Sequence, residues 1–219
     1  FGLLRKIFHA REIKMKICLI FAAALAIGYF MGCVHPSYIL GKLVKHVDIR
    51  EHGSNNSGAS NSVLVLGFKY GVLTAFVDIA KGFLAAFVVT HFISAGSELA
   101  YAASSGAILG HMFPFYLNFR GGKGLATLLG FGFAVRPILG LSLCLLLVAA
   151  ALLSDYIVVG TVCVSIAFMV FTAVVYGCSV PLAFALLVGG LILFKHRVNY
   201  KKIANGTETR ISGLFKKKA

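Results

Sequence analysis

Residues 138–175 read ILGLSLCLLLVAAALLSDYIVVGTVCVSIAFMVFTAVV and contain a single charged residue, Asp155. Two apolar runs, 138–153 and 157–175, lie on either side of a short polar break. Long runs without charge, separated by short loops, indicate membrane helices, whereas a membrane β-barrel shows short segments of alternating hydropathy. We therefore predict two membrane helices joined by a tight turn, in an all-α integral membrane protein.

The composition of the whole chain agrees with this class. Hydrophobic residues make up 59% of the 219 residues, charged residues make up 13%, and the mean hydropathy is +0.90, which excludes a soluble globular domain. Lys and Arg number 21 against 7 Asp and Glu, and the cations gather at the ends of apolar runs. We expect their partners to be the lipid bilayer and anionic substrates, and no nucleic acid.

The cysteines stand inside or at the edge of apolar runs, never in a C-x-x-C or Cys/His spacing. We expect them to be packing residues, and we expect neither a metal ion nor a cofactor. They are Cys18, Cys33, Cys144, Cys163 and Cys178.

Seven apolar runs predict about seven transmembrane helices. Cations flank them in a pattern that places the N-terminus outside and the polar motif loops and the C-terminus on the cytoplasmic side. Reading 124–153 as a half-helix plus one span would instead put the tail on the side opposite Lys123. The expected runs are 15–39, 70–93, 97–113, 124–135, 138–153, 157–175 and 181–194.

Three parts are expected along the chain. Residues 1–14 form a basic N-terminal extension, and Met15 is a candidate for the native start. Residues 15–195 form the polytopic membrane domain, and we expect its first span to be retained and to break near Pro36, because no A-x-A cleavage site precedes polar sequence. Residues 196–219 form a basic cytoplasmic tail.

Residues 110–127 read GHMFPFYLNFRGGKGLAT and interrupt the apolar sequence with glycines and cations. Glycines around Lys123 let backbone N–H groups approach a ligand, and a helix that begins there would add its positive dipole end. These features predict an anion site. A Walker P-loop is excluded, because Gly124 stands where Ser or Thr is needed. A glycine-rich surface turn with one snorkelling lysine is the other reading.

Two further polar features leave alternatives open. Residues 46–61, HVDIREHGSNNSGASN, suit either a solvated loop or a loop around a phosphate or polyol. Asp78 and Lys81 lie three residues apart inside an apolar run, so they share one helical face. They form either a self-neutralising pair near the membrane surface or part of a site.

Four segments in order resemble the motifs of the bacterial acyl-phosphate:glycerol-3-phosphate acyltransferases, the PlsY family. They are GSNNSGASN at 53–61, DIAKG at 78–82, the stretch at 110–127 and HRVNYKKIANGTE at 196–208. The similarity also takes in P-S-Y with G-K at 36–42 and D-I-R-E at 48–51, and it extends across nearly the whole chain after Met15.

The resemblance implies a seven-helix enzyme of the bacterial inner membrane, with its active site at the cytoplasmic face. The implied reaction moves a fatty acyl group from acyl phosphate to the 1-hydroxyl of glycerol 3-phosphate, as the first step of phospholipid synthesis. Functional coupling to the enzyme that makes acyl phosphate is implied as well. A transporter or binding protein for an anionic solute is an alternative, although no repeated halves are visible. A diverged paralogue with low turnover is another.

Two phosphate-bearing substrates need cations and neutral hydrogen-bond donors held close together. The candidate catalytic residues are His196, Asn199 and Lys123. The candidate substrate-binding and phosphate-binding residues are Arg50, Ser54, Asn56, Gly58, Ser60, Asn61, Asp78, Lys81, His111, Arg120, Gly121, Gly122, Gly124, Thr127 and Arg197.

No nucleophile motif is visible in the sequence, and acyl phosphate is already activated. We therefore expect direct attack by the glycerol hydroxyl, with the departing phosphate or His196 accepting its proton. The chain departs from the family pattern most at Leu64, where the family usually has Arg. Asn55 and Val198 are further departures.

Overall fold

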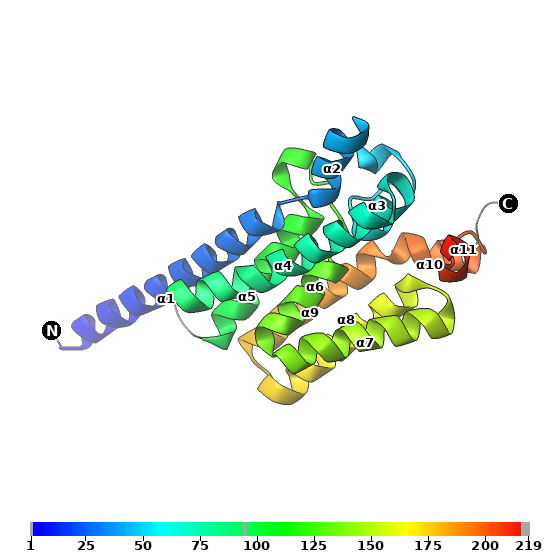
Figure 1. Ribbon diagram of the computed structural model, residues 1–219. Helices are drawn as coiled ribbons and strands as arrows, with labels where there is room; N and C mark the ends of the chain where they lie inside the picture. The colour runs from blue at the N-terminus through cyan, green and yellow to red at the C-terminus, as the bar shows by residue number, and fades with distance from the viewer. Residues whose placement is uncertain (1, 94–95, 216–219) are drawn as a thin grey trace.

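The computed structural model describes residues 2–93 and 96–215, and this part of the chain is helical and contains no β-strand (Figure 1). The elements in order are α1 (Gly2–Gly32), α2 (Pro36–Lys45), η1 (Ile49–Glu51), α3 (Ala59–Leu66), α4 (Phe68–Phe92), α5 (Ser97–Met112), η2 (Phe115–Leu117), α6 (Leu125–Val135), α7 (Pro137–Ser154), α8 (Ile157–Tyr176), α9 (Val180–Lys195), α10 (Arg197–Ala204) and α11 (Ile211–Phe215).

The body of the molecule is built from α1 and α4 to α9, which lie side by side (Figure 1). Among the described residues, five helical segments are long and apolar enough to cross a membrane. Helix α6 is apolar but shorter, and α5 has 16 residues rich in Ala, Ser and Gly. The all-helical membrane class is confirmed, whereas the number of spans and their sidedness stay predictions. The five segments are His9–Lys45, Phe68–Phe92, Pro137–Ser154, Ile157–Tyr176 and Val180–Ala204.

Helix α5 is the centre of the body. It packs against α1, α4, α6 and α9, and 13 of its 16 residues are buried. Its small residues form one core cluster with α1 and α4, while Tyr101 and Ile108 join a second cluster of larger side chains from α6 to α9. Small residues allow close helix approach, so α5 can be enclosed by neighbours and can carry His111 to the polar end of the body.

Helices α1 and α5 meet through reciprocal pairs of glycines spaced four residues apart. A Cβ at Gly28 would lie 1.8 Å from the carbonyl oxygen of Ala103, and a Cβ at Gly110 would lie 2.1 Å from that of Tyr29. Gly32 and Gly106 are equally close to the facing backbone. The crossing therefore depends on glycine, as in small-xxx-small membrane interfaces.

Proline and glycine set the helix boundaries. Helix α1 ends at Gly32 and α2 begins at Pro36, which confirms the expected break. Helices α3 and α4 are separated at Gly67, whose φ of 101° suits glycine, so Lys69 lies in the first turn of α4 and does not end the preceding segment.

Within the described ranges the five cysteines form no disulfide. Cys33 is buried, as expected of a packing residue, whereas Cys18 and Cys178 are exposed on the outside of the body.

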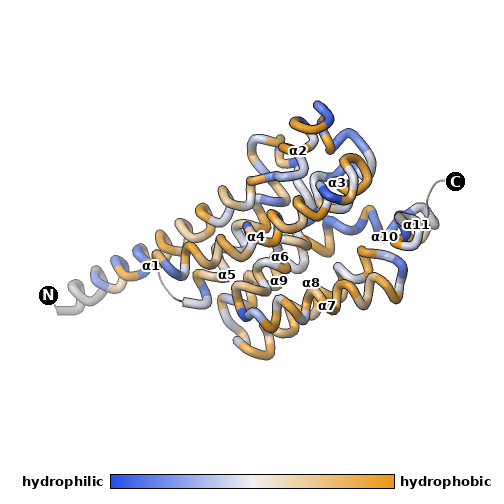
Figure 2. The backbone as a smooth tube through the Cα atoms, in the orientation of Figure 1, coloured by the Kyte–Doolittle hydropathy of each residue, from blue (hydrophilic) through white to orange (hydrophobic). Residues whose placement is uncertain are grey.

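Apart from the N-terminal turns of α1, most polar sequence lies at one end of the body (Figure 2). The end that carries α2, α3 and α10 includes the blue connections around residues 46–61 and 195–202, while the helical middle is predominantly orange. The polar motifs therefore share one end, as the charge pattern predicts.

We expect Gly28→Ala to destabilise the protein by roughly 1 to 3 kcal/mol, because its Cβ would push α1 away from the α5 backbone. The measurement is the thermal unfolding temperature of the detergent-solubilised protein. Gly190→Ala on α9 is the matched control, since a Cβ there meets nothing within 4 Å and alanine is the better helix former. Equal unfolding temperatures for the two variants would contradict the close crossing.

Candidate active site

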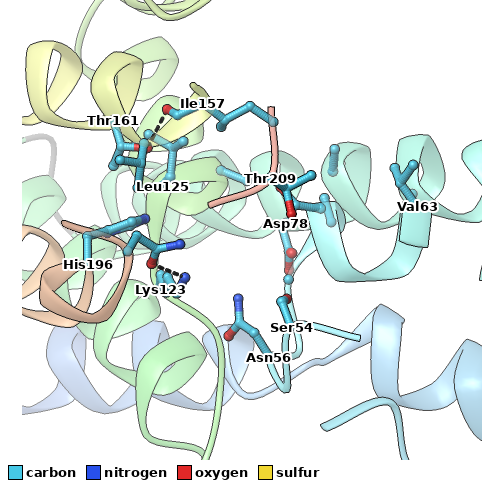
Figure 3. Close-up of a pocket in the computed structure, with 18 of the residues that line it drawn as sticks. Ser54, Asn56, Val63, Asp78, Lys123, Leu125, Ile157, Thr161, His196 and Thr209 are labelled. Atoms are coloured by element: carbon cyan, nitrogen blue, oxygen red, sulfur yellow. Dashed lines mark hydrogen bonds between the residues drawn. The ribbon is translucent and has the colours of Figure 1, made fainter. Parts of the chain in front are cut away.

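A cavity of about 340 Å³ lies at the polar end of the body, between the loop before α3, the sides of α4 and α8, and the tail (Figure 3). It brings together residues far apart in sequence. The predicted site residues that line it are Ser54, Asn56, Gly58, Ser60, Asp78, His111, Lys123, Gly124, His196 and Asn199.

Lys123 and Asn199 form one wall of the cavity. The Lys123 ammonium donates a hydrogen bond of 2.5 Å to Asn199 Oδ1, and Asn199 Nδ2 donates to both oxygens of Glu208 at 2.9 and 3.0 Å. Burial lowers the pKa of Lys123 from its usual value, while the Glu208 carboxylate opposes that shift. The result is a cation held in place beside the cavity.

His196 lies next to this wall, at the junction of α9 and α10, and is 5% exposed. Its Nδ1 is 2.8 Å from the carbonyl oxygen of Ile192. A carbonyl oxygen can only accept, so Nδ1 carries the proton and a neutral ring keeps Nε2 as an acceptor. Figure 3 shows His196 and Lys123 on the same side of the cavity, with Ser54 and Asn56 facing them. The ring can therefore accept a proton from a hydroxyl bound between these walls.

The facing wall is the polar loop, residues 53–58, which precedes α3. Asn61 is fully buried and organises it without lining the cavity. Its Oδ1 accepts from the Ser54 N–H at 2.7 Å, while Nδ2 donates to the carbonyl oxygens of Ile49, His52 and Asn56 at 2.8, 3.0 and 2.8 Å. The loop is thus a fixed part of the cavity wall and not simply a solvated connection.

The glycine-rich loop, residues 121–124, differs from the expected anion site. Gly124 lines the cavity with a φ of 91°, but the N–H groups of Gly121 and Gly122 donate to the carbonyl oxygens of Met112 and His111, at 3.2 and 2.9 Å. These two glycines are needed for packing, because a Cβ on Gly122 would lie 2.0 Å from His111 Nε2. The expectation that their N–H groups face a ligand is therefore wrong.

Asp78 and Lys81 are buried inside the protein, with exposed fractions of 1% and 5%, and they form the expected ion pair. Lys81 Nζ lies 2.8 Å from Asp78 Oδ1 and 2.8 Å from His111 Nδ1, and it donates to the carbonyl oxygen of Val34 at 2.7 Å. Asp78 and His111 reach the cavity, while Lys81 does not line it. Asp78 and His111 form the floor of the site, and Lys81 holds both of them from outside the lining.

Arg50 lies away from the cavity lining and is held by its neighbours. It contacts Asp48 at 2.6 Å, and this hydrogen bonding lowers the pKa of Asp48. Its Nη1 donates to the carbonyl oxygen of Leu117 at 2.7 Å and to that of Arg120 at 3.4 Å. Arg50 therefore connects the segment before the polar loop to the segment before the glycine-rich loop.

Arg120, Arg197 and Thr127 do not line the cavity either. Arg120 is exposed, and Arg197 lies over the Phe194 ring at 3.9 Å. Thr127 is buried where α6 crosses α4.

A family model described as glycerol-3-phosphate acyltransferase matches residues 22–206. The chain belongs to this family. The glycerol-3-phosphate acyltransferase of Thermoanaerobacter pseudethanolicus is 35% identical over 185 residues, which cover 84% of this chain and 92% of the relative. Glycerol-3-phosphate acyltransferase 1 of Oceanobacillus iheyensis is 34% identical over 209 residues, covering 91% and 99%.

Solved acyltransferase structures are similar along most of the chain. A crystal structure of PlsY, an integral membrane glycerol 3-phosphate acyltransferase, in its glycerol 3-phosphate form has a TM-score of 0.81 and 33% identity over 90% of this chain and 99% of that one. Its lysophosphatidic acid form has a TM-score of 0.79 at 33% identity, covering 89% and 96%. The resemblance to this acyltransferase family and the multi-pass membrane class are confirmed.

The acyltransferase cavity also contains residues that the sequence analysis missed. Glu208 and Thr209 come from the tail, and Thr161 comes from the first turns of α8. The tail is held over the cavity because Asp155 accepts hydrogen bonds of 2.7 Å from the Ser212 N–H and hydroxyl groups. Glu208 ends the motif at 196–208 and is one of only 7 acidic residues in the chain, a signal that could have identified it.

Proposed function

We propose that this chain transfers a fatty acyl group from acyl phosphate to the 1-hydroxyl of glycerol 3-phosphate, releasing 1-acyl-glycerol 3-phosphate and inorganic phosphate. The observation that carries the proposal is the position of Lys123 and His196 on the same side of a cavity that also has an apolar side. That side, formed by residues such as Val72, Ile157 and Val158, suits the acyl chain of an amphipathic donor.

The reaction needs one bond exchange at the acyl carbon. The glycerol oxygen attacks this carbon, the bond from carbon to the phosphate oxygen breaks, and the hydroxyl proton passes to His196 Nε2 or to the departing phosphate. Lys123 stabilises the negative charge that develops on phosphate. Ser54 and Ser60, the serines that line the cavity, have no hydrogen bond to a histidine in the described ranges, and Ser57, which is bonded to His35, does not line it. The proposed step therefore uses no serine nucleophile. Positioning and electrostatics are therefore sufficient for the proposed step.

The membrane position of the site is also a proposal. We place the cavity at the cytoplasmic face of the bacterial inner membrane, because Lys42, Lys123, Lys195 and the cations of α10 share its end of the body. An enzyme that makes acyl phosphate must supply the donor, so we also propose functional coupling to it.

Lys123→Ala should lower turnover about ten- to a hundredfold, the scale of one lost charge-assisted bond, while the protein still folds. The assay follows phosphate release and formation of 1-acyl-glycerol 3-phosphate by purified protein. Lys201→Ala is the control, since Lys201 is exposed and does not line the cavity. Release of phosphate without the acylated product would reject the proposed transfer, and unchanged turnover of Lys123→Ala would reject the role of this lysine.

Leu64→Arg should raise catalytic efficiency toward glycerol 3-phosphate by roughly tenfold or more. Leu64 lines the cavity and is 45% exposed, so an arginine there has space to reach a phosphate that leucine cannot hydrogen-bond. Lys69 does not line the cavity and cannot replace this contact. Leu64→Gln separates charge from side-chain length. Equal or lower efficiency in folded Leu64→Arg would mean that the chain holds phosphate in another way.

Single cysteines at Asn55→Cys, Asn118→Cys and Asn205→Cys should react with an impermeant thiol reagent only from the cytoplasmic side, because these three exposed positions share the cavity end. The background lacks the native cysteines. A variant that keeps only Cys178, which is exposed at the turn between α8 and α9, should react from the opposite side. Any of the three labels reacting from outside would overturn the proposed sidedness.

A further inference from the structure

The connection between α1 and α2 carries a histidine that the proposed reaction does not use. His35 is fully buried, and its ring stacks on that of His111 with centroids 5.2 Å apart and planes 20° apart. A buried polar ring needs a hydrogen-bond partner. The groups that contact His35 show which parts of the site this residue connects.

One partner belongs to the polar loop. His35 Nδ1 is 3.3 Å from the hydroxyl oxygen of Ser57, which is also fully buried. The carbonyl oxygen of Ser57 accepts a second hydrogen bond, of 2.6 Å, from the Ser37 hydroxyl. Ser57 stands between Asn56 and Gly58, both of which line the cavity. His35 and Ser37 thus hold the polar loop through their hydrogen bonds with Ser57.

The stacked ring belongs to the other wall. The carbonyl oxygen of His111 accepts from the Gly122 N–H at 2.9 Å, and its ring leaves no room for a Cβ on Gly122. Gly122 precedes Lys123 directly. The His111 ring and backbone therefore pack directly against the residue that precedes Lys123.

We propose that His35 is a positioning residue that sets the distance between the polar loop at 53–58 and the glycine-rich loop that carries Lys123. Contacts run without a gap from Ser57 through His35 and His111 to Gly122. The inference rests on the proposed function for the identity of the substrate, since the two loops would hold glycerol 3-phosphate between them. Loss of this link would let the two loops separate and weaken their hold on ground state and transition state alike, which raises KM with little change in kcat.

Ser57→Ala tests the link with a small change in volume, and His35→Phe tests it from the other side by keeping a ring but removing Nδ1. Each variant should raise KM for glycerol 3-phosphate about five- to tenfold, the scale of one lost buried hydrogen bond, with kcat changed less than about twofold. Because both remove one contact, the double variant should be no worse than the more affected single variant. Ser165→Ala is the matched control: Ser165 is also fully buried, and its hydroxyl has no hydrogen-bond partner within the described ranges.

A second measurement does not depend on activity. Amide hydrogen exchange at residues 53–58 should be faster in unliganded Ser57→Ala and His35→Phe than in the unaltered protein or in Ser165→Ala. Loss of transfer activity in the unaltered protein would reject the proposed function but leave this measurement valid. Unchanged exchange in both variants, or multiplied KM effects in the double variant, would overturn the linking role of His35.

Discussion

The buried ion pair between Asp78 and Lys81 is the interaction on which the site depends. Charges inside an apolar helical body are tolerated only when they are paired and hydrogen-bonded, and loss of one partner typically costs about 3 to 5 kcal/mol. Lys81 meets this requirement through contacts to Asp78 on α4, His111 at the end of α5 and the Val34 carbonyl oxygen after α1. The Lys81 ammonium therefore links α4, the end of α5 and the segment after α1 at one level of the helical body. The glycine-rich loop lies against the His111 end of this cluster.

Hydrogen bonding within the two loops that border the cavity determines which of their polar groups face it. Gly121 and Gly122 donate to carbonyl oxygens at the end of α5, so the glycine-rich loop contributes rigidity and the ammonium of Lys123. On the opposite wall Asn61 takes up the carbonyl oxygens of the polar loop, which leaves the side chains of Ser54 and Asn56 at the cavity. The proposed anion recognition therefore relies on side chains, which these backbone hydrogen bonds hold in place.

Properties local in sequence were predictable, and properties that depend on packing were not. Uninterrupted apolar runs predicted the helices, and the i, i+3 spacing of Asp78 and Lys81 predicted a shared face. How deeply that face is buried depends on how closely α5 packs against α4. The local spacing of the two residues does not encode this packing. Partners distant along the chain were missed for the same reason. Glu208 reaches Asn199 only because the tail folds back, and His35 reaches His111 only because α2 departs from the end of α1.

The tail contact determines which way the Asn199 amide faces. Glu208 has only acceptor oxygens when ionised, so it binds the Nδ2 donors and leaves Oδ1 directed at Lys123. The reverse orientation would place donors against an ammonium and an acceptor against a carboxylate, and both contacts would be repulsive. With Oδ1 in place, one of the three ammonium protons is used and two remain for substrate oxygens. The Glu208 carboxylate thus keeps the Lys123 ammonium correctly presented to the cavity, which explains how an acidic side chain can belong to a site that we propose binds two anions.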